Sequence, residues 1–304
     1  MTRRVVAAGL GNGRILAKIA EHGDAGRVKL LAQGDSWFAF PFPILGGSRN
    51  IIDAISTRRR TVAIDLSAFG DTAEAMAQGE RFAQYRTILA GGGGEPPIPV
   101  AAILLSAGGN DLIDRIGDLV GLVTRQVKRE AAGAAASGVQ RRAHARVLAA
   151  LKGEGARQIF DDVLAHLRTL IDARDGGPSR KSPVILHGYC HVTPRDAPAM
   201  SFPIRVGPWI WKTLTPLGYT QAQQQRIAAA VIDELNLRLA ALHDERRGIH
   251  VLDLRTLQAD GTLPVASPKD LEPTAYWHDE IHLNTAGWNA LAARVFDPLL
   301  DRLL

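Results

Sequence analysis

Several features are scarce in this chain, and each absence excludes a class of protein. A single cysteine, Cys190, among 304 residues excludes an internal disulfide framework and fits a reducing compartment. No run of 18 uncharged apolar residues occurs, which argues against a membrane-spanning helix. The apolar stretch near the N-terminus is soon interrupted by Asn12, Arg14 and Lys18, so we predict no cleaved export signal. We therefore expect a cytoplasmic protein.

The positive charge of the chain is concentrated in one segment. The net charge is +5, and residues 119–155 alone hold seven Lys and Arg against two Glu, so the remainder is neutral. Such a stretch is most often a solvated helix face, and peripheral attraction to an anionic surface is the functional alternative. It contains no Phe, Trp or Tyr for base stacking and no nucleic-acid motif, so we expect no nucleic-acid partner.

Short apolar runs, mostly β-branched, predict strands that are buried on both faces. They span residues 28–32, 61–66, 100–106, 183–189 and 249–254. Helical patterns separate them, at 50–59, 72–89, 156–173, 222–246 and 286–304. This alternation predicts a parallel sheet with helices on both faces, in a single three-layer α/β domain over residues 1–304.

Two insertions interrupt the alternation. The first, at about 119–155, is the basic segment, which is rich in Ala and is predicted to be largely helical. The second, at about 194–219, carries five prolines together with Trp209, Ile210 and Trp211. Because apolar side chains of this size are costly to leave in water, we expect the second insertion to cover the core, a partner subunit or a substrate pocket.

The informative residues follow the predicted strands, at the edge where open α/β sheets bind ligands. The first predicted strand runs into Gly34-Asp35-Ser36. Gly34 permits a tight turn, and Ser36 then lies where a helix N-terminus offers free N–H groups to an oxyanion. Simple capping of a helix by Asp35 or Ser36 is the ordinary alternative.

The loops after the next two strands offer hydrogen-bond donors. Gly70 follows the second strand and could lend its backbone N–H, and Asn110 follows the third strand in a Gly-Gly-Asn-Asp sequence. Asn side chains serve as oxyanion-hole donors in acyl transfer. The alternative is that both sequences are plain turns.

A carboxylate and an imidazole stand near the C-terminus as Asp279-x-x-His282. A carboxylate three residues before a histidine can accept a hydrogen bond from Nδ1, which leaves Nε2 free to take a serine proton. His278 is a competing base, but no Asp precedes it by three residues. A surface loop before the final helix is the ordinary alternative.

Other patterns compete with this one. His187 and His191 flank Cys190 and suggest a thiol–imidazole pair or a metal site, but no carboxylate-rich cluster accompanies them. Residues 9–13 suggest a phosphate loop, but their spacing differs from Gly-x-Gly-x-x-Gly and no strand of convincing length precedes them. No Gly-x-Ser-x-Gly elbow occurs, which removes the defining signal of the α/β-hydrolase fold.

Taken together, the motifs resemble those of the SGNH hydrolases, also called GDSL-type esterases and lipases. The matching blocks are Gly34-Asp35-Ser36, Gly70, Gly108-x-Asn110-Asp111 and Asp279-x-x-His282. Their order and spacing follow the family from residue 28 onward. The chain departs from the family pattern at Trp37-Phe38, where a leucine-containing continuation is usual, and at Asp65, where an Asn is often found.

The resemblance implies a flavodoxin-like fold with five parallel strands. It also implies an oxyanion hole made by the N–H groups of Ser36 and Gly70 and the amide of Asn110. Ser36 is then the nucleophile, His282 the base and Asp279 the group that orients the base. No metal or organic cofactor is required.

We expect hydrolysis of a small-molecule or lipid ester, with Trp37, Trp209 and Trp211 near the bound substrate. A carbohydrate O-deacetylase is one alternative, because aromatic residues also stack on sugars. An acyl- or sugar-binding module without turnover is another. The oligomeric state stays open.

Overall fold

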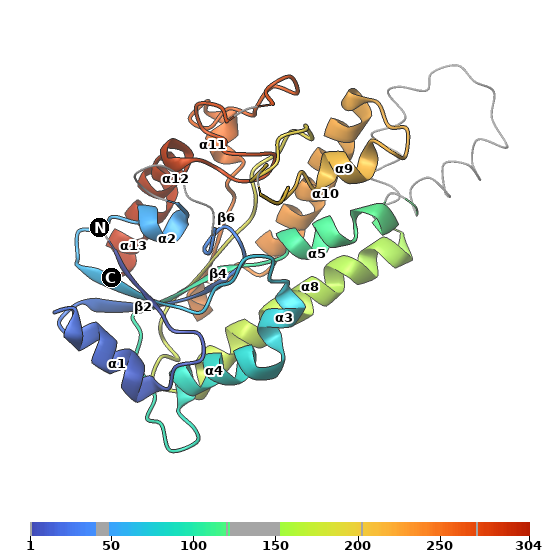
Figure 1. Cartoon of the computed structure of the whole chain (residues 1–304). Coiled ribbons are helices and arrows are strands. Elements are labelled where there is room, and N and C mark those ends of the chain that lie inside the picture. The colour runs from blue at the N-terminus through green and yellow to red at the C-terminus, as the bar shows by residue number, and fades with distance from the viewer. Residues whose placement is uncertain (1, 41–48, 120, 122–152, 202, 272) are drawn as a thin grey trace.

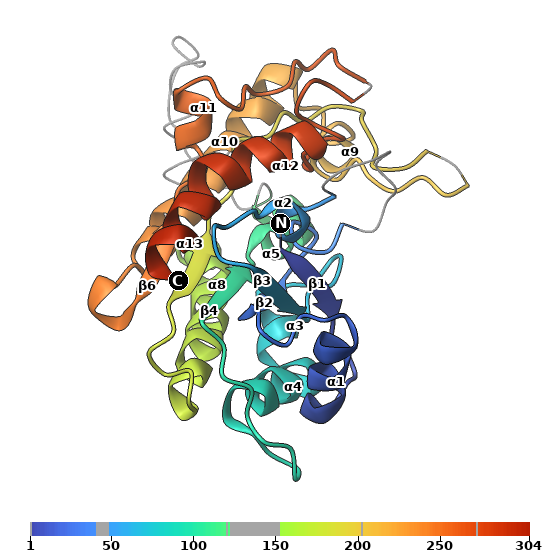
Figure 2. The same cartoon turned by 90° about the vertical axis from the view of Figure 1, so that its left-hand side faces the viewer.

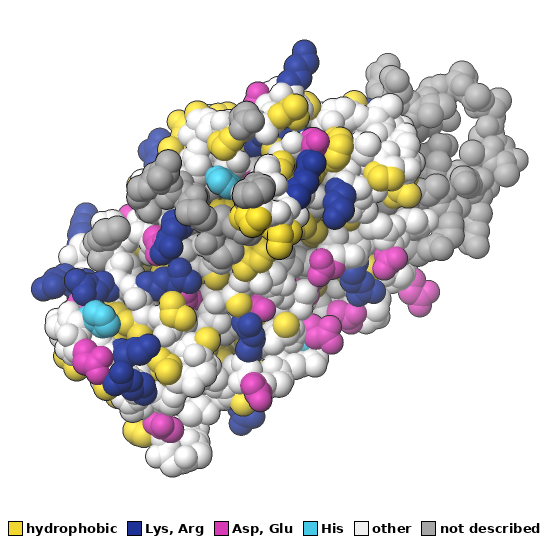
Figure 3. All heavy atoms as spheres, viewed as in Figure 1, with side chains coloured by type: hydrophobic (Ala, Val, Ile, Leu, Met, Phe, Trp, Pro, Cys, Tyr) yellow, Lys and Arg dark blue, Asp and Glu magenta, His cyan; other side chains and the backbone are white. Residues whose placement is uncertain are grey.

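The computed structural model describes residues 2–40, 49–119, 121, 153–201, 203–271 and 273–304 (Figure 1). Most of the basic insertion predicted at 119–155 lies outside the described residues, so its helical character and its attraction to anionic surfaces stay predictions. On the face seen in Figure 3, Lys and Arg are interspersed with Asp and Glu over the described surface. None of the helices in the described ranges combines the length and the apolar character that a bilayer crossing requires.

Six parallel strands form one sheet in the order β1-β3-β2-β4-β5-β6. Their bounds are β1 Arg3–Val6, β2 Val28–Gly34, β3 Thr61–Asp65, β4 Ala102–Ser106, β5 Val184–His187 and β6 Ile249–Leu252. The predicted three-layer α/β architecture with a parallel sheet is confirmed, but the predicted number of five strands was wrong. The strand that was not predicted is β1. Among the described strands it pairs only with β3, and it is partly exposed, so it lacks the continuous apolar run of the buried strands.

Helices cover both faces of the sheet (Figures 1 and 2). One face carries α3, α4 and α8, and the other carries α2, α12 and α13, with α12 and α13 joined by a π-helical segment, Ala292–Phe296, into one rod. The helix bounds are α1 Asn12–Glu21, α2 Ile51–Ala54, α3 Ala73–Ala77, α4 Gly79–Ala90, α5 Gly109–Asp114, α8 Glu154–Ala173, α9 Ile210–Leu214, α10 Gln221–Ala240, α11 Thr256–Ala259, α12 Thr285–Leu291 and α13 Asp297–Leu303.

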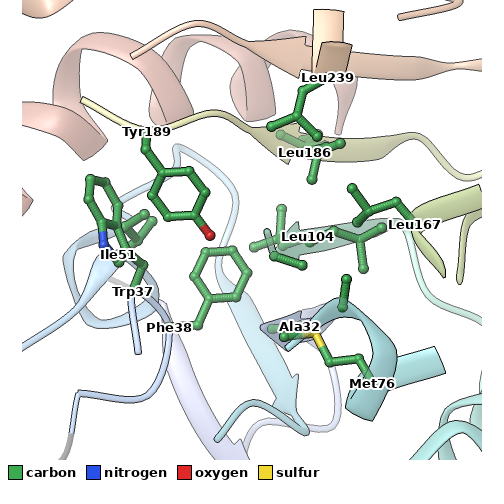
Figure 4. Close-up of a cluster of buried hydrophobic side chains, with 14 of the residues drawn as sticks. Ala32, Trp37, Phe38, Ile51, Met76, Leu104, Leu167, Leu186, Tyr189 and Leu239 are labelled. Atoms are coloured by element: carbon green, nitrogen blue, oxygen red, sulfur yellow. The ribbon is translucent and has the colours of Figure 1, made fainter. Parts of the chain in front are cut away.

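The pattern of apolar residues explains how α8 packs. Its buried residues recur every three or four positions and form one stripe: Ile159, Phe160, Val163, Leu164, Leu167, Leu170 and Ile171. Figure 4 shows Leu167 next to Leu104 of the sheet, with Leu186 above this pair and Met76 of α3 below it. Each such side chain contributes about 1.5–3 kcal/mol when it is fully buried, so this stripe fixes α8 to the strands.

The helix predicted at 50–59 is shorter in the structure and ends at Ala54. The backbone N–H groups of Ser56 and Arg58 donate instead to carboxylates of α13, those of Asp297 (2.9 Å) and Asp301 (2.6 Å). These tertiary hydrogen bonds replace the helical ones and tie the segment before β3 to the C-terminal helix.

The strand register places three loops side by side. Gly34 at the end of β2 pairs with Ser106 at the end of β4, and the N–H of Asp35 donates to the Ser106 carbonyl at 3.0 Å. On the other side of β2, the N–H of Ala68 donates to the Gly34 carbonyl at 3.0 Å. The segments that follow β2, β3 and β4 therefore leave the sheet together at its carboxyl edge.

Candidate active site

The turn after β2 leaves room for no side chain at Gly34. A Cβ atom there would lie 2.6 Å from the Phe38 ring and 2.8 Å from the Ser106 Cβ, closer than atoms can approach. Glycine lets the chain pass between these groups and brings Ser36, which is 4% exposed, to the edge of the sheet. The Gly-Asp-Ser sequence is thus explained by packing before any chemistry is considered.

The carboxylate of Asp35 holds this turn in shape. One oxygen accepts hydrogen bonds from the Trp37 N–H (2.9 Å) and the Ser106 hydroxyl (2.7 Å), and the other accepts from the Tyr189 hydroxyl (2.5 Å). Burial raises the pKa of Asp35, and the hydrogen bonds from Tyr189 and Ser106 act in the opposite direction. Asp35 therefore links the turn to β4 and to the segment after β5.

His282 joins Ser36 to Asp279. Its Nε2 lies 2.8 Å from the Ser36 Oγ, and its Nδ1 lies 2.8 Å from Asp279 Oδ2. The other oxygen of Asp279 accepts from the backbone N–H groups of Ile281 and His282, both at 2.8 Å, which locks the carboxylate in place. Because a carboxylate only accepts hydrogen bonds, it holds the proton of a neutral His282 on Nδ1 and leaves Nε2 as an acceptor.

Aromatic rings surround the His282 imidazole. The centroid of the Phe40 ring lies 4.5 Å from that of His282, the Trp209 ring lies 5.3 Å away in an edge-on orientation, and the Phe69 ring lies 6.0 Å away. His282 is 0% exposed. These rings come from three separate loops, and they limit the access of water to the imidazole.

The expected oxyanion donors follow β2, β3 and β4. The N–H groups of Ser36 and Gly70 donate to no acceptor among the described residues, and Gly70 has a φ of +83°, which glycine adopts readily. Nδ2 of Asn110 donates to the Asp71 carbonyl at 2.9 Å. Since an amide nitrogen carries two hydrogens, this bond orients Asn110 and leaves its second hydrogen for a ligand.

Neighbouring carboxylates fix the two donor loops. Asp111 accepts the Ala73 N–H with both oxygens, at 2.9 and 3.1 Å, which ties the loop after β4 to the start of α3. Asp65, one of the departures from the family pattern, pairs with Arg4 of β1 and accepts the Ser67 N–H at 2.9 Å. Burial raises the pKa of Asp65, and the positive charge of Arg4 opposes that shift.

A narrow cavity of about 60 Å³ adjoins Ser36 and Asn110. Its walls come mainly from α5, from α10 and from the first residue of α9, and they are almost entirely apolar. The apolar side chains include those of Leu112, Ile113, Ile116, Ile210, Ala228, Val231, Ile232 and Leu235. The cavity can therefore hold a hydrocarbon group whose polar end lies beside the Ser36 hydroxyl.

The three tryptophans predicted near the substrate have different places. Trp37 is buried and lines the cavity, where it also stacks on His187. Trp209 packs edge-on against His282 and does not line the cavity. Trp211 is half-buried and reaches neither the cavity wall nor the imidazole. Ile210, between the last two, does line the cavity.

The competing histidines and the cysteine do not converge. His278 contacts the Ala199 carbonyl through Nε2 at 3.0 Å, and His191 pairs with Asp233 at 2.7 Å. Cys190 is buried, its Sγ lies 3.6 Å from the Leu254 carbonyl, and burial raises the pKa of its thiol. In the described part of the chain, no group of three or more His, Cys, Asp and Glu side chains could hold a metal ion.

The glycine-rich segment 9–13 requires a correction, because a strand does precede it: β1 ends at Val6 and α1 begins at Asn12. The start of α1 is nonetheless occupied by protein. The Glu95 carboxylate accepts the Gly13 N–H at 2.9 Å, and the Asn12 side chain donates to the Thr87 carbonyl at 2.8 Å. An internal carboxylate therefore stands where a phosphate would bind.

Glu280 is a buried residue beside the site that the sequence analysis did not single out. It is 1% exposed, and its carboxylate accepts hydrogen bonds from the N–H groups of Trp209 (2.6 Å), Ile210 (2.9 Å) and Trp211 (2.7 Å). Burial raises the pKa of Glu280 to about 7, and these N–H groups oppose the shift. In sequence it is an ordinary acidic residue beside Asp279, and its partners lie about 70 positions away, so no local pattern indicates its role.

The sequence matches no protein-family model and no curated protein. Among solved structures it is similar to phospholipase A1 from Streptomyces albidoflavus NA297, with 15% identity, 92% of this chain and 100% of that chain covered, and a TM-score of 0.47. An extracellular lipase from Streptomyces rimosus is 17% identical over 91% of this chain and 100% of that chain, with a TM-score of 0.49. A lipase/acylhydrolase from Enterococcus faecalis is 13% identical over 90% and 94%, with a TM-score of 0.36. The resemblance to the SGNH hydrolases continues to rest on the motifs.

Proposed function

We propose that the protein is a serine hydrolase that cleaves carboxylic esters of apolar acyl groups. The observation that carries this proposal is the buried imidazole of His282, which lies 2.8 Å from the Ser36 hydroxyl on one side and 2.8 Å from the Asp279 carboxylate on the other. A hydroxyl that faces the free nitrogen of an oriented imidazole has the arrangement of an activated nucleophile.

In the first half of the reaction, the Ser36 Oγ attacks the ester carbonyl carbon while His282 Nε2 takes the hydroxyl proton. The carbonyl oxygen becomes an oxyanion, to which the N–H groups of Ser36 and Gly70 and the amide of Asn110 donate hydrogen bonds. Asp279 stabilises the imidazolium that forms. His282 then gives the proton to the leaving alcohol as the bond from the carbonyl carbon to the alcohol oxygen breaks, which leaves an acyl group on Ser36.

In the second half, a water molecule takes the place of the alcohol. His282 removes one of its protons, and the resulting hydroxide attacks the acyl carbon. The bond to Ser36 breaks, the carboxylic acid leaves, and the serine hydroxyl regains its proton from His282. Each half of the reaction returns the imidazole to its neutral form.

The cavity beside Ser36 favours an acyl chain over a sugar. Its walls are formed mainly by Leu, Ile and Val side chains, most of them from α5, α9 and α10, which offer apolar contact and few partners for sugar hydroxyls. A carbohydrate O-deacetylase stays the alternative, because an acetyl group would also fit beside Ser36 and the sugar could then lie outside the cavity.

The test uses p-nitrophenyl esters of increasing acyl length, with acetylated xylan alongside, on the wild type and on Ser36→Ala. We expect hydrolysis by the wild type, and Ser36→Ala should retain less than a few per cent of it because alanine has no hydroxyl oxygen to attack the ester. A fluorophosphonate should label the wild type at Ser36, as located by mass spectrometry.

Ser201→Ala is the matched control, because it removes an exposed hydroxyl from the 194–219 insertion and should leave the rate unchanged. Acetate release from xylan without hydrolysis of longer esters would favour the deacetylase. A folded wild type that is neither labelled nor active would identify a binding module and refute the proposed hydrolase.

A further inference from the structure

We infer that Glu280 is a positioning residue, which holds the segment Trp209–Trp211 against the active site and so determines both the cover over His282 and the fit of the acyl chain. The inference rests on the proposed function and deepens it. Glu280 follows Asp279 directly in sequence, yet the two carboxylates bind different groups: Asp279 binds the imidazole, and Glu280 binds backbone N–H groups from a distant loop.

The Glu280 carboxylate binds several backbone N–H groups at once, and we call this set of hydrogen bonds to residues 195 and 209–211 the Glu280 clamp. Three consecutive N–H groups, at 209, 210 and 211, donate to it at 2.6–2.9 Å, and the N–H of Arg195 donates at 3.3 Å. Above its raised pKa of about 7, Glu280 is ionised and these hydrogen bonds are charge-assisted, which makes them stronger than neutral ones. A buried carboxylate is costly to leave without them. The segment therefore cannot move away from Glu280 without a large loss of free energy.

The clamped segment contacts both functional parts of the site. Trp209 lies edge-on to the His282 ring, with 5.3 Å between centroids and an interplanar angle of 77°. The next residue, Ile210, forms part of the wall of the acyl cavity together with Ile281. One displacement of this short segment would therefore uncover the imidazole and widen the cavity at the same time.

Arg195 ties the other end of the same insertion to the same segment of chain. Its buried guanidinium donates to the carbonyl oxygens of Asp279 and Asp270, while its N–H donates to Glu280. The insertion and the segment that carries Asp279 and His282 thus form one hydrogen-bonded body. The Arg195 side chain binds backbone carbonyl groups of the segment after β6, whereas the Glu280 side chain binds the backbone of the residues that touch the imidazole and the cavity.

Replacing the carboxylate by an amide breaks the clamp without changing its size. In Glu280→Gln only one oxygen can accept, and the NH₂ group that replaces the other oxygen faces N–H donors. We expect Trp209 to become more accessible to solvent and Ile210 to fit the acyl chain less closely. Hydrolysis of long-chain esters should then suffer more than hydrolysis of the acetyl ester, which does not need the full cavity.

The first experiment compares Glu280→Gln with Glu234→Gln, a buried glutamate that pairs with Arg238 on α10 and does not line the cavity. We expect Glu280→Gln to lower kcat/KM roughly 10- to 100-fold on the longest p-nitrophenyl ester that the wild type accepts, the cost of a small misplacement in an active site. On the acetyl ester, kcat/KM of Glu280→Gln should fall by less than about a third of that factor. Glu234→Gln should have the wild-type kcat/KM on both esters. Equal losses on both esters, or no loss, would overturn the inference.

The second experiment is a double-mutant cycle of Glu280→Gln with Trp209→Ala. If Glu280 acts through the segment that carries Trp209, adding Glu280→Gln to Trp209→Ala should cost much less than it costs in the wild type. Trp211→Ala is the control, because Trp211 also donates its N–H to Glu280 but its ring reaches neither His282 nor the cavity wall. Fully multiplicative losses with Trp209→Ala would refute the positioning role.

Acrylamide quenching of tryptophan fluorescence tests the clamp without relying on activity. The difference between the wild type and Trp209→Ala isolates the signal of Trp209, and this signal should become more accessible to acrylamide in Glu280→Gln and not in Glu234→Gln. If the wild type hydrolyses no ester but Glu280→Gln makes Trp209 more accessible to acrylamide, the proposed hydrolase is refuted and the positioning role of Glu280 is supported. If the wild type is active but quenching of Trp209 is unchanged in Glu280→Gln, only the positioning role is refuted.

Discussion

Two buried histidines in this molecule lie among aromatic rings, and their surroundings differ in one respect that separates a base from a packing residue. His282 and His187 are both 0% exposed. The rings around His282 are those of Phe40, Phe69 and Trp209, and the rings around His187 are those of Trp37, Phe38, Tyr189 and Phe296. Aromatic enclosure alone therefore does not identify the active imidazole.

The difference lies in what the ring nitrogens contact. Nδ1 of His282 faces the Asp279 carboxylate and Nε2 faces the Ser36 hydroxyl. Nδ1 of His187 contacts the Gly188 carbonyl at 2.6 Å, and its Nε2 has no hydrogen-bond partner among the described residues. Burial lowers the pKa of His187 to about 4, so it stays neutral at neutral pH. A base needs both a carboxylate that stabilises its charged form and a hydroxyl to deprotonate.

Removing the carboxylate from His282 should make its surroundings resemble those of His187, and this gives the largest expected effect. Asp279→Asn should lower kcat by about 10⁴-fold, because an amide no longer fixes the tautomer or stabilises the imidazolium. Steady-state rates on a p-nitrophenyl ester measure the loss. Asp233→Asn is the control, because it breaks a second Asp–His pair of the described residues, the pair with His191, and should leave the rate unchanged. An Asp279→Asn enzyme that keeps a tenth of the activity would contradict the assignment.

The second effect concerns the oxyanion donors, which are proposed beside His282 and not beside His187. Asn110→Ala should lower kcat by roughly 10²–10³-fold with little change in KM, because the amide would bind the oxyanion more strongly than the ground-state carbonyl. Initial rates over a range of ester concentrations separate the two parameters. A mutant that loses affinity at constant kcat would assign Asn110 to substrate binding instead.

The smallest effect on activity is expected from His187→Phe, which should instead change the pH dependence of stability. An unfolded histidine has a pKa near 6.5, and the folded value is about 4, so between these values the unfolded state binds more protons. His187 should therefore add about 3 kcal/mol to the free energy of unfolding as the pH rises through this window, whereas buried carboxyl groups with raised pKa values, such as Glu280, act in the opposite direction. His187→Phe should remove the contribution of His187, so the difference in free energy of unfolding between wild type and variant should grow with pH by that amount.

Urea titrations at pH 4.5, 5.5 and 6.5 measure the slope, and ester hydrolysis at neutral pH serves as the control. A variant that keeps the wild-type slope would show that another group is responsible for it. A variant that loses ester hydrolysis while it stays folded would show that His187 supports the active site beyond packing.

Most of the sheet could be predicted because its strands are buried on both faces and read as apolar runs. β1 could not, since an edge strand with exposed Arg3 and Val6 carries no such run. The same short strand supplies Arg4 to Asp65, so the departure from the family pattern at Asp65 became intelligible only with β1 in place.

The site divides in a similar way. Ser36, Asp279 and His282 could be proposed together because short motifs fix local geometry and the carboxyl edge of a parallel sheet brings them together. Glu280 could not, because its partners are backbone N–H groups of a loop about 70 residues earlier, and backbone groups leave no mark in a sequence. Trp37 and Ile210 line the cavity, whereas the Trp211 ring does not. The apolar composition of the 194–219 insertion predicts that this loop covers an apolar part of the molecule. Which of its side chains line the cavity depends on tertiary packing.

The strand order has a consequence for how activity and folding separate. β2, which leads to the nucleophile, is hydrogen-bonded to β3 on one side and β4 on the other, whereas Asp279 and His282 follow β6, the last strand of the sheet. The imidazole therefore meets the serine only when the segment after β6 is packed against the turn after β2. If that segment were displaced, Ser36 would lose its base, while the turn that carries Ser36 would keep its own hydrogen bonds to β4.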